Sequence, residues 1–111
     1  MIARIIPIKR MPKQLSVLDY KVPKKMEKTI QIGQLVSIEI RRSQVFGIVL
    51  STKNSADYLG KIKEIESIIH STPLLSDRQL HIYKIISRWY GVPISTILKV
   101  FSINLSKLGF L

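Results

Sequence analysis

The chain has 111 residues, of which 46% are hydrophobic, and its 18 Lys and Arg against 7 Asp and Glu give a net charge of +11. This length and composition indicate one domain with a hydrophobic core and argue against a disordered chain. The absence of cysteine excludes disulfide scaffolds, thiolate catalysis and cysteine-ligated zinc. The apolar runs are too short to span a membrane and the start lacks a signal-peptide pattern, so we expect a cytoplasmic protein.

The first segments of the chain predict two short strands. Residues 2–8 are rich in β-branched side chains, and Pro7 suits the end or the edge of a strand. Residues 17–22 alternate in polarity and stop at a proline. Because successive side chains of a strand point to opposite faces, we expect Asp19 to face away from its two neighbours.

The clearest strand signal is a hairpin in the middle of the chain. Residues 34–42 alternate over their full length, and residues 45–50 follow after a predicted turn near Ser43 and Gln44. Gly47 in the second strand predicts a bulge or a close approach of another backbone, as in a small curled sheet or barrel. The periodicity of residues 62–69 fits either a helix or a strand.

The last third of the chain predicts two helices. Ser76 and Gln79 have the spacing of a capping box, and Leu75 and Leu80 have that of a hydrophobic staple. Gly91 is placed to end this first helix. The expected apolar face of the first helix consists of Ile82, Ile85, Ile86 and Trp89, and a second helix from Pro93 is expected to bury Ile94, Ile97, Leu98 and Phe101.

Sequence signatures of catalysis are missing. The chain contains no phosphate-binding GxxxxGK[ST] loop, no GxGxxG and no GxSxG pattern. His70 and His81 lack a metal-binding spacing, and Glu64 and Glu66 fit a solvated charged face better than an acid–base pair. The sequence therefore predicts no catalytic residue, no metal site and no cofactor.

The positive charge is concentrated in the first half of the chain and indicates a polyphosphate partner. Residues 1–53 hold eleven Lys or Arg and three Asp or Glu. A nucleic acid is favoured, because clustered cations gain affinity by releasing counterions from phosphates; an anionic membrane surface or simple solubility is the alternative. The candidate phosphate contacts are Lys9, Arg10, Lys13 and Lys21, with Lys24, Lys25 and Lys28 nearby, although such lysines also form solvated rims.

Asp19 is a carboxylate among these cations. It is either a counter-ion for Lys21 or Lys13, or a hydrogen-bond acceptor for the exocyclic amines of a base. A carboxylate approaches phosphates at a cost, so its presence in a basic groove fits a place where a base edge or a sugar hydroxyl arrives. Trp89 and Tyr90 offer a stacking surface, but a tryptophan at helical spacing is more often part of a core.

Seven segments share their order and spacing with a known family: residues 3–8, 18–23, 33–38, 47–49, 62–63, 72–75 and 89–94. The most distinctive is 18–23, where Asp-Tyr is followed by Val-Pro. From near its start to about residue 105, the chain resembles the amino-terminal DNA-binding domain of the replication-restart helicase PriA, also called primosomal protein N-prime.

In that family the domain looks like a small β-rich unit backed by helices, and it captures the 3′-terminal nucleotide of a nascent strand at a stalled replication fork. The resemblance therefore favours a strand over residues 62–69. It implies that Asp19 accepts hydrogen bonds from the terminal base, that Leu18 and Tyr20 form the pocket around it, and that Lys63 reaches the nucleotide from the later strand.

Two positions depart from the family pattern. Leu18 stands where the family usually has an aromatic residue, so a stacking contribution is lost there. The family's Val-Pro-Phe-Gly after the third strand is replaced by Ile-Glu-Ile-Arg at residues 38–41. Arg41 thus takes the place of a glycine, where it either blocks the pocket or supplies a phosphate contact.

These observations predict an α+β fold, with a small curled, barrel-like sheet over residues 1–70 and two packed helices over 76–105. Residues 106–111 are expected to begin a linker or a truncated tail. The expected function is non-catalytic capture of branched or 3′-ended DNA, with ATP-dependent 3′-to-5′ helicase activity belonging to a full-length chain. The helicase body and single-strand-binding or other primosome proteins are further expected partners. The alternatives are a sequence-independent RNA- or ribosome-binding protein and a protein-interaction domain.

Overall fold

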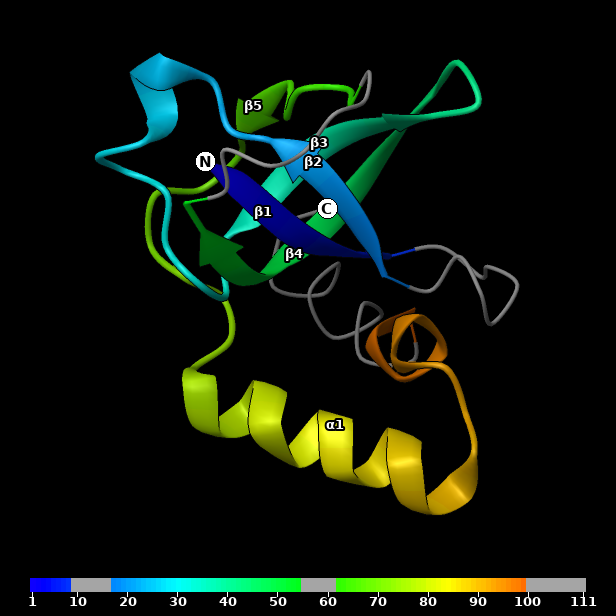
Figure 1. The fold of residues 1–111 in the computed structure, drawn as a ribbon. Coiled ribbons are helices and arrows are strands. Elements are labelled where there is room, and N and C mark those ends of the chain that lie inside the picture. Colours follow the sequence, from blue (N-terminus) through cyan, green and yellow to red (C-terminus); the bar gives the residue numbers. More distant parts are fainter. Residues whose placement is uncertain (9–16, 55–61, 100–111) are drawn as a thin grey trace.

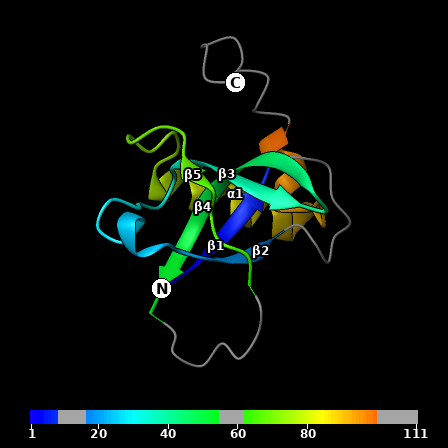
Figure 2. The ribbon, with the colours of Figure 1, turned by 90° about the horizontal axis from the view of Figure 1, so that it is seen from above.

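Five antiparallel strands form one curled sheet in the computed structural model, which describes residues 1–8, 17–54 and 62–99 (Figure 1). The strand order is β2-β1-β4-β3-β5. Figure 2, which looks down from above, shows the strands overlying the helix α1. The elements are β1 (Ile2–Pro7), β2 (Leu18–Lys21), the 3-10 helix η2 (Lys24–Met26), β3 (Leu35–Ile40), β4 (Ser43–Lys53), β5 (Ser67–Ile68) and α1 (Asp77–Tyr90), and residues 94–99 are helical. The predicted α+β fold is confirmed.

The two edges of the sheet are joined by one connecting segment, which gives the sheet its barrel-like shape. The Lys21 amide of the edge strand β2 donates to the Lys63 carbonyl oxygen at 2.9 Å, and the Ile65 amide donates to the Lys21 carbonyl oxygen at 3.0 Å. The same segment continues into β5, which pairs with β3. Satisfying the backbone groups of an edge strand in this way removes a site of unwanted pairing.

This segment resolves the ambiguity of residues 62–69 in favour of extended backbone. The strand proper is shorter than expected, because only Ser67 and Ile68 pair with β3, and Glu64 forms a single bridge to Lys21. Ile65 is buried at 2% exposure inside the sheet. Ile65 is buried because this segment closes the barrel. The local periodicity of residues 62–69 does not contain that contact, so it could not distinguish a helix from a strand.

Strand β4 bends where it packs against β1. Leu50 has no partner opposite it, because the pairing shifts between Arg4–Ser51 and Ile5–Val49. A bulge of this kind bends a strand and increases its twist. A Cβ on Gly47 would lie 2.5 Å from Cγ2 of Ile5, so β4 packs this closely only with glycine there. The same Cβ would lie 3.2 Å from the Ile6 carbonyl oxygen, so the predicted close approach of another backbone is confirmed.

The hairpin of β3 and β4 turns earlier than expected. Ile40 pairs with Ser43, so the turn consists of Arg41 and Arg42 and not of Ser43 and Gln44. Both arginines have a positive φ, 49° and 67°. Two-residue hairpin turns of this shape match the twist of the strands, but they favour Asn and Gly. Arg-Arg is not a sequence typical of such a turn. The prediction therefore extended the alternating strand through both arginines and placed the turn too late.

The first of two apolar clusters fills the inside of the curled sheet. Alternation along the strands separates it from the second cluster: Ile5 points inward, whereas Ile6 points toward the helices. The buried members of the inner cluster are Ala3, Ile5, Tyr20, Val22, Met26, Val36, Ile38, Ile40, Val45, Val49 and Ile65.

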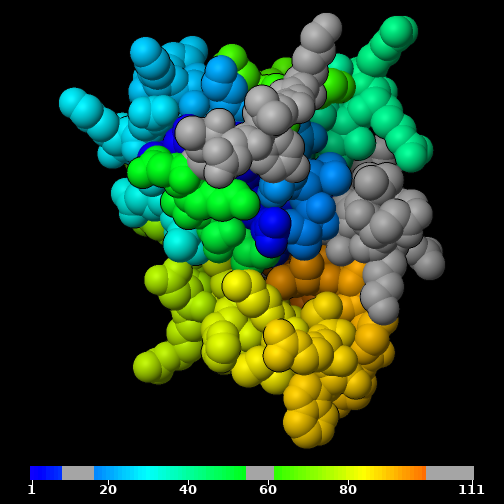
Figure 3. Space-filling model, viewed as in Figure 1, coloured from blue at the N-terminus to red at the C-terminus, as the bar shows by residue number. Residues whose placement is uncertain are grey.

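The second cluster joins the sheet to the helical layer, which Figure 3 shows in yellow and orange below the strands. Its buried members are Ile6, Leu35, Ile48, Leu75, Leu80, Ile94 and Leu98. The predicted capping box is confirmed: the Gln79 amide donates to Ser76 Oγ, and the Ser76 amide donates to the Gln79 side chain. Gly91 ends α1 in the left-handed conformation, with φ 64°.

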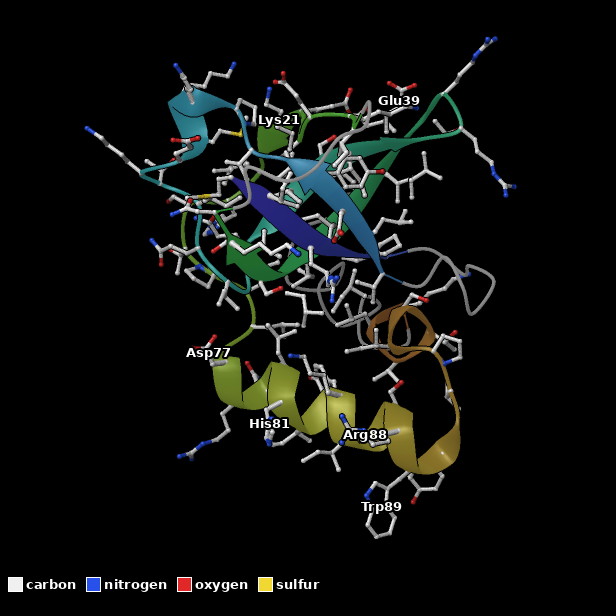
Figure 4. All side chains as sticks on the ribbon, in the orientation of Figure 1. Lys21, Glu39, Asp77, His81, Arg88 and Trp89 are labelled. Carbon is white, nitrogen blue, oxygen red and sulfur yellow. The ribbon has the colours of Figure 1, made fainter. Side chains whose placement is uncertain are left out.

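The predicted buried face of α1 is wrong. Ile82 and Ile85 are 46% and 42% exposed, and Trp89 is 82% exposed. In Figure 4 Trp89 points away from the sheet. The helix packs instead through Leu80, which is buried in the second cluster, and through the partly buried Tyr83. Ile86, the other member of the predicted face, is half-buried.

The second helical segment is confirmed in its described part. Ile94, Ile97 and Leu98 are buried. Phe101, the last residue of the expected stripe, lies outside the described residues.

Candidate nucleic-acid interface

The carboxylate of Asp19 pairs with an arginine that the sequence did not suggest. Antiparallel pairing of β1 and β2 places Arg4 opposite Asp19 on the same face of the sheet. Arg4 Nε donates to Asp19 Oδ1 at 3.2 Å, and the two side chains are 50% and 19% exposed. The counter-ion is therefore Arg4 and not Lys21, and the second expected counter-ion, Lys13, lies outside the described residues. Only the strand register could reveal this partner.

A hollow of about 420 Å³ opens beside this pair. We call it the Asp19 hollow; it is lined by Arg4, Val17, Leu18, Asp19 and Leu50. A carboxylate has about four lone-pair sites, so the bond from Arg4 leaves Asp19 able to accept further hydrogen bonds. The hollow thus combines an acceptor, a cation and three apolar side chains, which suits a ligand with an apolar body and polar edges.

The neighbours of Asp19 have different surroundings. Leu18 lines the Asp19 hollow with its half-buried side chain and also packs against the inner cluster. Tyr20 is 5% exposed, and its hydroxyl donates to the Glu39 carbonyl oxygen at 2.7 Å. Burial raises the pKa of the Tyr20 hydroxyl, and the carboxylates of Glu39 and Glu66 raise it further. Tyr20 is not among the residues that line the hollow, so the structure brings together only Leu18 and Asp19 of these three.

Lys63 forms an ion pair with Glu39 and does not lie beside Asp19. Lys63 Nζ is 3.3 Å from Glu39 Oε1, and both side chains are about half exposed. Glu39 also accepts the Tyr20 hydroxyl through its backbone oxygen. In Figure 4 Glu39 and Lys21 lie at the end of the molecule away from α1. Lys63 is not one of the residues that line the Asp19 hollow.

The other expected cations are spread around the sheet. Arg41 is exposed at the tip of the β3–β4 hairpin and does not line the Asp19 hollow. Lys21 is exposed at the end of β2. Lys9, Arg10 and Lys13 lie outside the described residues.

Within residues 1–8, 17–54 and 62–99, no group of three or more His, Cys, Asp or Glu is placed to hold a metal ion. None of the helices in these ranges has the length and apolar character needed to cross a membrane.

Two comparisons with known proteins bear on the chain as a whole. A family model described as the 3′DNA-binding domain (3′BD) of PriA matches residues 5–102. The replication restart protein PriA of Chlamydia muridarum is 29% identical over 90 residues, which cover 77% of this chain. The match covers 12% of that relative, so the chain corresponds to a small part of its length.

Proposed function

Because the chain belongs to the PriA 3′DNA-binding domain family, we propose that it captures the 3′-terminal nucleotide of a nascent strand at a stalled replication fork. DNA binding in replication restart is the property of the family itself. The finer statement, that the domain recognises the end of a strand, is supported by the chemistry of the Asp19 hollow.

The observation that carries the proposal is the placement of a partly buried carboxylate at the edge of a hollow of about 420 Å³. A terminal nucleotide offers a free 3′-hydroxyl and the donors of its base, both of which a carboxylate accepts well. An internal nucleotide, or a phosphorylated end, places a negative phosphate there instead. Like charges at short range repel each other, so Asp19 favours the free end.

The site residues take the following roles in the proposal. Asp19 accepts hydrogen bonds from the terminal nucleotide, Leu18 forms an apolar wall, and Arg4 holds Asp19 in place. Tyr20 positions β2 through its bond to Glu39 and thereby shapes the pocket. Lys63 exchanges its Glu39 contact for the nucleotide, while Arg41, Lys9, Arg10, Lys13 and Lys21 contact phosphates farther along the DNA.

The proposal extends to the protein of which such a domain is a part. The domain positions DNA for an ATP-dependent 3′-to-5′ helicase body and does not itself catalyse a reaction. It works in the cytoplasm on branched or 3′-ended DNA, together with single-strand-binding or other primosome proteins. No cofactor takes part in the capture step.

A fluorescence anisotropy titration tests the capture step. Single strands with a 5′ fluorophore carry either a 3′-hydroxyl or a 3′-phosphate, and the measured quantity is the ratio of their affinities. We expect the wild-type chain to prefer the hydroxyl end and Asp19→Ala to lose this preference. Glu64→Ala, which removes an exposed carboxylate outside the hollow, should keep it. A wild-type ratio of one would overturn the proposal, and equal binding of RNA would favour a general nucleic-acid-binding role.

A further inference from the structure

A second hollow, of about 560 Å³, lies between the sheet and the carboxyl-terminal half of α1. We call it the helix groove. Its charged lining residues are Arg4 from β1 and Lys84 and Arg88 from α1. Leu50, Ser87 and Gly91 are among its other lining residues.

The helix groove adjoins the Asp19 hollow. Arg4, Val17 and Leu50 line both, so these three side chains form the boundary that the two hollows share. Leu50 reaches this position because it is the unpaired residue of the β4 bulge. A chain whose end occupies the Asp19 hollow can therefore continue along α1.

The groove is cationic throughout. Its three charged lining residues are all basic, and Asp19 of the adjoining hollow is paired with Arg4. Lys84 and Arg88 are four residues apart on one side of the helix, where like charges destabilise each other. In the part of the chain that the structure describes, neither takes part in an ion pair. Both charges are thus available to an anionic ligand.

The wall of the groove is held in shape by the end of the helix. The Ser87 hydroxyl donates to the Val92 carbonyl oxygen, and Gly91 makes the turn with φ 64°. Arg88 belongs to the last turn of α1, where a cation is also favoured by the helix dipole. The cations therefore project from a fixed support, which lowers the entropic cost of binding.

We propose that the helix groove binds the phosphodiester backbone of the nucleotides that precede the captured 3′ end, with Lys84 and Arg88 each contacting a phosphate. This inference rests on the proposed function, because the captured end sets the direction of the strand. The apolar side chains of Val17 and Leu50 support the sugar between the Asp19 hollow and the first of these phosphates. The contacts are to the backbone, so they carry no sequence preference.

The test measures how the affinity for a 3′-hydroxyl single strand depends on salt. Each phosphate contact on a single strand contributes about 0.7 to the slope of log affinity against log salt. We expect Lys84→Ala and Arg88→Ala each to reduce this slope by about 0.7, and the double variant by about twice that. Lys84→Arg and Arg88→Lys keep the charge and should keep most of the slope.

A matched control distinguishes the groove from general electrostatics. Arg78→Ala removes a charge from the first turn of the same helix, and this residue does not line the groove. Slopes for Lys84→Ala and Arg88→Ala equal to that of Arg78→Ala would overturn the inference. Circular dichroism of each variant shows whether α1 is intact.

The same experiment separates this inference from the proposed function. If the wild-type chain prefers 3′-hydroxyl ends but the groove variants keep the full slope, end capture is supported and phosphate binding in the helix groove is rejected. If the slopes fall but the wild type shows no preference for the free end, the end-capture proposal is rejected. The helix groove then binds single strands independently of their ends. The groove variants should also retain the ratio of 3′-hydroxyl to 3′-phosphate affinity.

Discussion

Arg4 Nε lies 3.2 Å from Asp19 Oδ1, across the antiparallel pair of β1 and β2. One cross-strand contact therefore links the acceptor of the Asp19 hollow to the cations of the helix groove, because Arg4 lines both. Arg4 neutralises part of the charge of Asp19 and donates a hydrogen bond to its carboxylate. In the proposed DNA interface, the pair explains how a carboxylate can lie among cations.

Replacing Arg4 by glutamine should weaken DNA binding without removing the preference for a free 3′ end. The groove loses one of its three cations, whereas Asp19 keeps its charge and repels a 3′-phosphate more strongly. The pair is partly exposed, so the free energy of unfolding should change by less than about 1 kcal/mol. Anisotropy titrations and urea denaturation measure the two effects, with Arg4→Lys as the control that retains the charge. A lost end preference would contradict the assigned roles.

Tyr20→Phe should reduce the free energy of unfolding by about 1–3 kcal/mol at neutral pH. The variant removes the hydroxyl that donates to the backbone carbonyl oxygen of Glu39 and leaves that oxygen without this partner. Urea denaturation at pH 7 measures the change.

The effect of Tyr20→Phe should shrink at alkaline pH. The pKa of Tyr20 is raised in the folded protein above its ordinary value of about 10, so its contribution is complete below that value. Above it the unfolded chain ionises first, and the contribution is lost as the pH rises toward the folded pKa. A difference between wild type and variant that stays constant up to pH 11 would contradict this.

Gly47→Ala should destabilise the protein by about 1–3 kcal/mol through overpacking. The added methyl group would lie 2.5 Å from Ile5 Cγ2, so β4 must shift away from β1. Gly91→Ala is the comparison, because nothing lies within 4 Å of its added Cβ. Its cost, about 1–2 kcal/mol, arises from the left-handed conformation alone. The Gly47 variant should in addition perturb chemical shifts across the β1–β4 pair, and the Gly91 variant should not.

Trp89→Ala should change the free energy of unfolding by less than about 0.5 kcal/mol, because its side chain is 82% exposed. Leu80→Ala, on the same helix but 2% exposed, should cost about 2–5 kcal/mol. Urea denaturation of both variants compares the two faces of α1. Equal losses would mean that α1 also packs through its outer face.

Replacing Arg41 and Arg42 by Asn and Gly should stabilise the hairpin by about 1 kcal/mol or more, since these residues adopt a positive φ at lower cost. The variant also removes two exposed cations. If Arg41 contacts a phosphate, the salt slope of DNA binding should fall by about 0.7. A more stable protein with an unchanged slope would place Arg41 outside the interface.

Local patterns predicted β1 to β4, the capping box and the end of α1, but they misplaced the β3–β4 turn and left residues 62–69 undecided. The alternation of residues 17–22 also placed Asp19 on the face opposite Leu18 and Tyr20, as the structure has it. These features depend on neighbours in the chain: the period of a strand, the spacing of Ser76 and Gln79, and the conformational freedom of Gly91. The resemblance to a family favoured one of the two roles that the residues left open for Asp19, and it added the candidate role of Lys63, which no local pattern contains.

By itself the sequence determined a basic, β-rich domain that ends in helices, because charge and hydrophobic period are properties of the chain alone. Tertiary structure decided which residues come together: it pairs Arg4 with Asp19 and Lys63 with Glu39, and it places Lys84 and Arg88 around the same hollow as Arg4. It also decided that Leu80 is buried and that Trp89 is exposed. Strand register and helix orientation fix these contacts, and both arise when the whole core packs, so no window of sequence carries them.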